Sequence, residues 1–184
     1  MEQRRLLFYL TMQNHFQLFH LPQRFTLDMA VLEAAYHEVQ NQAHPDRFAG
    51  ATGAEKRVAM QWATHANEAY RILKHPLRRA RYLCELNGAQ LQTESNTAMP
   101  AAFLMRQMAW HETLDEVKAQ QDGAALERLQ REIDGAYQDT AAQAADLLDA
   151  ENFAAAAHMV RQWLFLEKFS DHVATALERL AEDR

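Results

Sequence analysis

A His-Pro-Asp tripeptide stands out in this 184-residue chain, because these three residue types in this order can present a carboxylate to another molecule. The tripeptide consists of His44, Pro45 and Asp46. Proline fixes its own φ and restricts the residue before it, so the flanking polar side chains point in a limited set of directions. A carboxylate held in this way can form a bidentate pair with an arginine of a partner protein. Alternatively, His44 and Asp46 could act as a catalytic acid–base pair. Catalysis also needs a pocket and a nucleophile or metal, and an exposed turn between helices offers neither. We therefore predict that the chain is not an enzyme.

The other histidines and the single cysteine do not suggest a metal site. His65 and Glu68 share a helix face, but no second pair of this kind completes a carboxylate-bridged site. One cysteine can neither form an internal disulfide nor supply the thiolates of an iron–sulfur cluster. Because Cys84 lies in an apolar helical run, we predict that it is buried, and we expect no metal and no cofactor. The histidines expected to be solvated or hydrogen-bonded on helices are His65, His111, His158 and His172.

The tripeptide is predicted to lie in a loop between two helices. Asp28 is a typical N-cap for a helix that runs to about Ala43, where the restriction before proline ends it. The next helix is predicted from about Ala54 to Leu73. Proline, glycine and apolar spacing predict further helices at 14–19, 76–86, 100–121, 124–150 and 153–182. With only 5 Gly and 4 Pro and no phosphate-binding glycine motif, the chain is predicted to be all-α.

A polar segment divides these predicted helices into two groups. Residues 14–87 form an N-terminal helical unit, residues 88–99 a linker, and residues 100–184 a three-helix bundle with short connections. Residues 1–13 are interpreted as a disordered or mis-annotated extension, with Met12 as a candidate start. Charge is also divided, since residues 1–87 carry 11 Lys or Arg and 8 Asp or Glu, whereas residues 88–184 carry 8 and 17. Either two units with different partners or one solvated acidic face explains this difference.

Composition excludes several kinds of partner. A net charge of -6 is not that of a nucleic-acid-binding protein. No apolar run approaches the roughly 18–20 residues that cross a membrane. A single cysteine is typical of a reduced compartment. The sequence therefore predicts a cytoplasmic protein with neither nucleic acid nor membrane as its partner.

Some apolar residues of the predicted bundle do not fit a single buried face. In the last helix, Phe165 lies about 100° around the helix from a regular apolar stripe. In the first bundle helix, Leu104, Met105 and Met108 lie beside such a stripe. These side chains either widen the core face or form an exposed patch for another protein, with Glu112 as a polar neighbour. Periodicity leaves both interpretations open.

The sequence around the tripeptide resembles a J-domain, the module that docks on DnaK-class chaperones. The helix after it contains ANEAYRIL at residues 66–73, which is similar to the closing helix of that family. Two further segments resemble HscB-type co-chaperones of iron–sulfur cluster assembly, namely HPLRRARYL at 75–83 and FLMRQM at 103–108. The resemblance covers about residues 14–183. It implies a J-domain with a junction helix at 14–87, followed by a scaffold-binding three-helix bundle.

This resemblance implies a co-chaperone that delivers an iron–sulfur cluster scaffold protein (IscU-like) to a DnaK-class chaperone (HscA-like). The co-chaperone would stimulate the ATPase of that chaperone and so promote cluster transfer and protein maturation. The positions implied in chaperone binding are His44, Pro45, Asp46, Arg47, Phe48, Lys56 and Arg57. The positions implied in scaffold binding are Leu104, Met105, Met108, Glu112 and Phe165, the residues that the patch interpretation had already selected.

The chain departs from the family pattern at two places. The helix before the tripeptide, which is usually basic in J-domains, contains almost no positive charge, and Ala109 stands where relatives tend to carry an acidic residue.

A general J-protein that presents unfolded clients is the alternative function. Such proteins often carry Gly-rich or Cys-rich zinc regions, and neither is present in this sequence.

Overall fold

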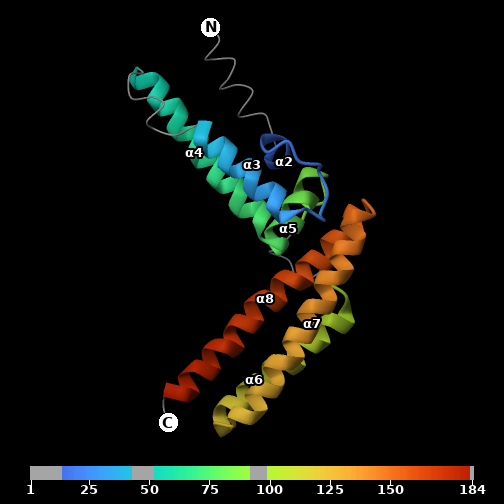
Figure 1. The fold of residues 1–184 in the computed structure, drawn as a ribbon. Coiled ribbons are helices and arrows are strands. Elements are labelled where there is room, and N and C mark those ends of the chain that lie inside the picture. The colour runs from blue at the N-terminus through green and yellow to red at the C-terminus, as the bar shows by residue number, and fades with distance from the viewer. Residues whose placement is uncertain (1–13, 43–51, 92–98, 183–184) are drawn as a thin grey trace. The chain divides into compact units, whose positions relative to one another are not determined.

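The computed structural model describes residues 14–42, 52–91 and 99–182, and these ranges are helical without any strand (Figure 1). The helices are α2 (His15–Leu18), α3 (Met29–Gln42), α4 (Gly53–Lys74), α5 (Pro76–Leu86), α6 (Ala101–Gln120), α7 (Gly123–Asp149) and α8 (Phe153–Glu182). The prediction of an all-α protein is confirmed. Among the described helices, none combines the length and the apolar character needed to span a membrane.

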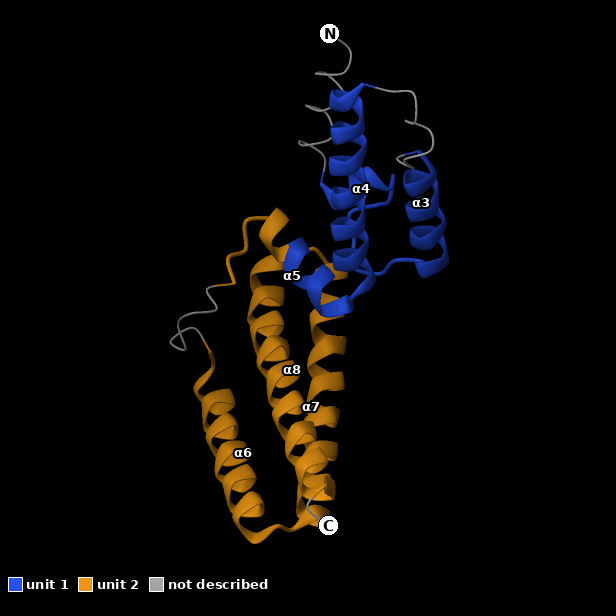
Figure 2. Cartoon of the chain, turned by 90° about the vertical axis from the view of Figure 1, so that its left-hand side faces the viewer, with its two compact units in different colours: residues 1–83 blue, residues 84–184 orange. Residues whose placement is uncertain are grey.

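The chain divides into two compact units, residues 1–83 and residues 84–184 (Figure 2). The division falls inside α5, a few residues before the polar segment that the sequence suggested as a linker. Each unit has its own buried residues and is described separately below.

Side-chain caps set where the helices of the first unit begin. The Asn14 carboxamide oxygen accepts the backbone N–H of Gln17 at 2.9 Å, and the Gln17 side chain accepts the backbone N–H of Asn14 at 3.0 Å. This reciprocal pair is a capping box, and Thr52 with Glu55 forms another at the start of α4. Asp28 accepts the backbone N–H of Ala30 at 2.9 Å, as expected for the residue before α3.

Helices α3 and α4 lie side by side in the first unit (Figure 1). The rings of Tyr36 and Tyr70 stack with centroids 4.1 Å apart, and the Tyr36 hydroxyl donates to the Asn67 carboxamide oxygen at 3.0 Å. Leu32 of α3 and Leu73 of α4 are fully buried. The His-Pro-Asp tripeptide comes between these two helices in the sequence, and residues 43–51 lie outside the described ranges.

In the second unit, α7 and α8 form a long antiparallel hairpin and α6 lies along it (Figure 2). The apolar stripe predicted for the last helix, from Val160 to Leu180, is buried as far as Val173 and half-buried at Leu177 and Leu180. Gln121 ends α6 in the left-handed region with φ 53°, and the Asp122 side chain then caps α7. The core of the bundle consists of Trp110, Leu114, Val117, Leu126, Leu129, Ile133, Ala136, Leu166, Phe169, Val173 and Ala176.

Candidate functional site on α6

The outer side of α6 carries two of the most exposed apolar side chains in the described part of the chain. Met105 is 71% exposed and Met108 is 63% exposed, whereas Leu104 is half-buried. We call Leu104, Met105 and Met108, together with Phe165 of α8, the apolar patch. Side chains as exposed as the two methionines contribute little to folding, so these two residues do not belong to a widened core face.

Phe165, for which the spacing left both a core and an exposed position open, is half-buried against the core. Its ring packs edge-on against Phe103 at 5.7 Å between centroids and lies nearly parallel to Phe169 at 5.6 Å. The 100° offset from the apolar stripe directs Phe165 towards α6 rather than towards solvent. Phe165 therefore joins the apolar patch to the core of the bundle.

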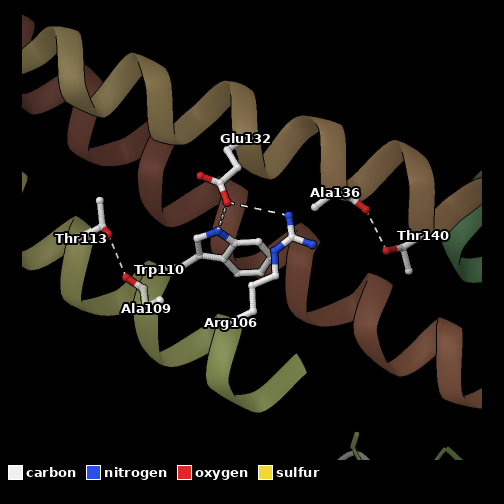
Figure 3. Close-up of polar contacts among 7 residues, drawn as sticks. All are labelled: Arg106, Ala109, Trp110, Thr113, Glu132, Ala136 and Thr140. Carbon is white, nitrogen blue, oxygen red and sulfur yellow. Dashed lines mark hydrogen bonds and ion pairs between the residues drawn. The ribbon is translucent and has the colours of Figure 1, made fainter. Parts of the chain in front are cut away.

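A polar contact attaches α6 to α7 on the other flank of the helix (Figure 3). The Trp110 indole N–H donates to the Glu132 carboxylate at 2.8 Å. The Arg106 guanidinium lies 4.6 Å from the centroid of the Trp110 ring and 3.8 Å from the same carboxylate oxygen. Sequence reasoning missed this contact, since a pairing between residues on different helices depends on a helix register that periodicity does not give.

Two more residues of α6 differ from a simple apolar stripe. Gln107, which interrupts the stripe in the sequence, is buried, and its carboxamide nitrogen lies 3.7 Å from the Met99 sulfur. His111 is exposed, as expected, but its ring also packs edge-on against Phe169 at 4.8 Å between centroids. Glu112 is exposed one turn beyond Met108, so a carboxylate borders the apolar patch.

The predicted chaperone-binding residues are only partly within the described ranges. His44, Pro45, Asp46, Arg47 and Phe48 lie outside them. Lys56 and Arg57 are described, and both are exposed near the start of α4. The capping box of Thr52 with Glu55 fixes that start, so the two basic residues follow the tripeptide on a well-defined helix.

Cys84 is fully buried, as predicted. Burial, followed by the neighbouring Glu85, raises the pKa of its thiol to about 11, so the group is neutral at pH 7. A neutral, buried thiol is a poor nucleophile and a poor metal ligand. In the three described ranges, no three His, Cys, Asp or Glu side chains form a group that could hold a metal ion.

Comparisons with known proteins agree with this architecture. Residues 99–174 match the family model of the HSCB C-terminal oligomerisation domain. The chain is 52% identical over 164 residues to a co-chaperone protein HscB homologue of Bordetella petrii, covering 89% of this chain and 95% of that protein. It is 49% identical over 167 residues to an HscB homologue of Burkholderia multivorans, covering 91% and 95%.

Solved structures extend the likeness to the three-dimensional fold. The chaperone HscB from Vibrio cholerae has a TM-score of 0.77 and 35% identity, and the likeness covers 91% of this chain and 99% of that one. The human co-chaperone HscB has a TM-score of 0.81 at 22% identity, covering 89% and 82%, which supports the fold alone.

The fold is thus that of a J-domain protein, in which an N-terminal helical J-domain precedes a C-terminal helical bundle. Within that class, the chain belongs to the HscB family of co-chaperones, which confirms the family predicted from its motifs. It is accordingly a co-chaperone of iron–sulfur cluster assembly.

Proposed function

We propose that this protein binds an iron–sulfur cluster scaffold protein through the apolar patch and delivers it to a DnaK-class chaperone. In this proposal residues 14–87 act as the J-domain, residues 88–99 as a linker and residues 100–184 as the scaffold-binding bundle. Without catalysing a reaction itself, the protein stimulates the ATPase of the chaperone through the His-Pro-Asp tripeptide and promotes transfer of the cluster. Membership in the HscB family supports this proposal.

The observation that carries the scaffold-binding part is the exposure of Met105 and Met108 on a helix whose opposite side is core. Covering an exposed methionine fully contributes roughly 1.5–3 kcal/mol. A micromolar complex needs about 8 kcal/mol in total. Because about two thirds of each side chain is left to cover, the two methionines together supply about 2–4 kcal/mol, a quarter to a half of that binding free energy. Methionine also adapts its shape to a partner surface.

The chaperone-binding part rests on the position of the tripeptide between α3 and α4. Helix α3 carries Glu33 and Glu38 and no Lys or Arg, so it offers no positive face to an acidic partner. Positive charge near the tripeptide in the sequence comes instead from Arg47, Lys56 and Arg57. We therefore assign docking mainly to the tripeptide with these three residues, and expect a weaker dependence on salt than a basic α3 would give.

The proposal is tested by the steady-state ATPase rate of the cognate DnaK-class chaperone. The rate is measured with this protein alone, with the scaffold alone and with both. We expect stimulation by this protein alone and a more than additive rate with the scaffold, because the patch and the tripeptide then act on one complex. Equal stimulation with and without the scaffold would indicate a general J-protein instead. An unchanged rate in every mixture would contradict the J-domain assignment.

A further inference from the structure

The end of α6 that carries the apolar patch is the end with the least apolar burial. Upstream of Trp110, Gln107 is the one residue of the helix that is buried, and Phe103 is only half-buried. Downstream, Leu114 and Val117 are both buried, as is Trp110 itself. The first buried aromatic next to the patch is therefore Trp110. Its orientation sets how the patch end of α6 lies on the bundle.

Trp110 is held from three sides. Its indole N–H donates to Glu132 of α7, and Arg106 lies over its ring (Figure 3). Its ring is also within 11° of parallel to that of Phe165, with centroids 6.5 Å apart. Glu132 lies on α7, outside the two helices that carry the apolar patch. Through the Trp110 side chain it is nevertheless connected to Phe165, the aromatic residue of that patch.

The contact with Glu132 and the patch lie on opposite flanks of α6. Arg106 and Met108 are two residues apart, so they point about 160° apart around the helix. A contact on the Arg106 flank therefore resists rotation of α6 about its own axis. At a helix radius of roughly 5–6 Å, a rotation of about 20° would move each side chain of the patch by roughly 2 Å. Such a shift would change how Leu104 and Met108 of α6 lie relative to Phe165 of α8.

From this geometry we propose that Glu132 is a positioning residue for the scaffold-binding patch, acting through Trp110 and Arg106; the inference rests on the proposed function. The ion pair itself is weak, because Arg106 and Glu132 are 53% and 54% exposed. The bond from the indole is the stronger contact. It is charge-assisted, and the Trp110 side chain that donates it is 3% exposed. Removing the acceptor leaves a buried N–H without its bond and releases Arg106.

Three variants on α7 separate positioning from charge. Glu132→Leu removes the acceptor and the charge, whereas Glu132→Gln keeps an oxygen that can accept from the indole and removes only the charge. Glu127→Leu is the matched control, since Glu127 is an exposed glutamate that pairs along α7 with Arg131 at 3.9 Å. Each variant is compared with the wild type by circular dichroism and thermal unfolding before binding is measured.

The binding readout is the dissociation constant for the scaffold by isothermal titration calorimetry. We expect the constant to rise about 5- to 10-fold for Glu132→Leu and to stay within about twofold for Glu132→Gln and Glu127→Leu. Stimulation of the chaperone ATPase without scaffold should be unchanged in all three. Wild-type affinity in Glu132→Leu would overturn the proposal. So would equal weakening by Glu132→Gln, because that result would mean that only the charge matters.

A second readout needs no partner. Hydrogen exchange of the amides at residues 103–110 should accelerate in Glu132→Leu and not in Glu132→Gln, and the indole N–H resonance of Trp110 should shift most in Glu132→Leu. Unchanged exchange and an unshifted resonance would overturn the positioning role, whatever the scaffold does. If wild-type protein fails to bind the scaffold while these two signals change as expected, the proposed function fails and the control of α6 by Glu132 stands.

Discussion

The two exposed methionines of α6 carry the scaffold-binding part of the proposed function. Met105 and Met108 are 71% and 63% exposed, and a third methionine, Met60 of α4, is 71% exposed in the other unit. Exposed apolar side chains that folding does not need are free to be used for binding. Met60 therefore offers a control of the same residue type and the same exposure.

We expect the double variant Met105→Ala, Met108→Ala to bind the scaffold about 2 kcal/mol more weakly, because its apolar contact area is smaller. This corresponds to a dissociation constant about 30-fold higher than that of the wild type. Unfolding free energy should change by less than about 0.5 kcal/mol, since both side chains are exposed. Met60→Ala should leave both quantities unchanged. Titration calorimetry and urea unfolding measure the two effects, and equal affinity of the double variant and the Met60 control would refute the assignment.

Phe165 differs from the methionines because it serves the core and the patch together. Its half-buried ring packs against Phe103 and Phe169. Phe165→Ala should therefore destabilise the bundle by about 2 kcal/mol, below the roughly 3–5 kcal/mol of a fully buried phenylalanine, and weaken scaffold binding as well. Urea unfolding followed by circular dichroism measures the first effect. Phe165→Leu, which keeps apolar volume, should recover most of the stability, and a fully stable alanine variant would show that the ring does not belong to the core.

His15 gives the first unit a dependence on pH. Its ring stacks on Tyr82 at 4.2 Å and lies 5.5 Å from His65. Burial, followed by the charge of His65, lowers the pKa of His15 from 6.5 to about 4, and Glu68 opposes this shift. Between pH 6.5 and 4 the unfolded chain binds a proton that the folded chain does not. The stability of the unit is therefore retained above pH 6.5 and falls as the pH drops towards 4.

The full shift corresponds to about 2 kcal/mol of unfolding free energy between about pH 7.5 and pH 5. Because the His15 ring is only half-buried, solvent screening reduces the expected loss to about 1 kcal/mol. The His15→Gln variant does not titrate in this range, so its stability difference between the two pH values should be smaller than that of the wild type by that amount. Urea unfolding at both pH values gives the comparison. Identical differences in the two proteins would show that His15 does not control the pH dependence.

At the scale of elements, the sequence predicted the helices well because their ends are chemically marked. Prolines, glycines and capping residues define most boundaries, and α8 begins at the predicted Phe153 and ends at Glu182. The local sequence pattern also predicted the burial of Cys84 and of the apolar stripe of α8 between Val160 and Val173. Which side of α8 faces α6 did not follow, because periodicity gives an angle around one helix and no position for its neighbours. This is why the spacing left Phe165 open between core and solvent, and why the contact between Trp110 and Glu132 was missed.

The capping box at the start of α4 directly precedes Lys56 and Arg57, two residues of the proposed chaperone site. Thr52 donates its backbone N–H to Glu55 at 2.8 Å and accepts the backbone N–H of Glu55 at 3.4 Å. Thr52→Ala breaks this box and should cost about 1 kcal/mol of unfolding free energy. Thr64→Ala is the control, since Thr64 is exposed in the middle of α4 and bonds along its own helix, to the carbonyl of Met60.

If the cap also positions Lys56 and Arg57, Thr52→Ala should raise the chaperone concentration needed for half-maximal stimulation by about two- to fivefold. Denaturation and ATPase titrations measure the two quantities. An unchanged stability in Thr52→Ala would show that the box does not stabilise α4, whereas a loss as large in Thr64→Ala would point to a general sensitivity of this helix.

At the scale of the whole molecule, two compact units carry two proposed binding sites. The tripeptide belongs to the unit of residues 1–83, and the apolar patch belongs to that of residues 84–184. Their charges also differ, since the second half of the sequence carries most of the acidic excess. A J-domain without the bundle could stimulate a chaperone but could not choose the scaffold as its client. In the proposed function, joining the two units in one chain raises the effective concentration of scaffold at the chaperone.

The separation of the two sites predicts opposite failures in two variants. His44→Gln should abolish stimulation of the chaperone ATPase and leave the scaffold dissociation constant unchanged, because it alters only the tripeptide. The double variant Met105→Ala, Met108→Ala should keep basal stimulation and lose the extra stimulation that the scaffold provides. Mixing the two variants should not restore the more than additive rate, since scaffold and J-domain would then be on different molecules. Full synergy in that mixture would show that the two sites need not share one chain, and a folded variant that loses both activities would contradict their independence.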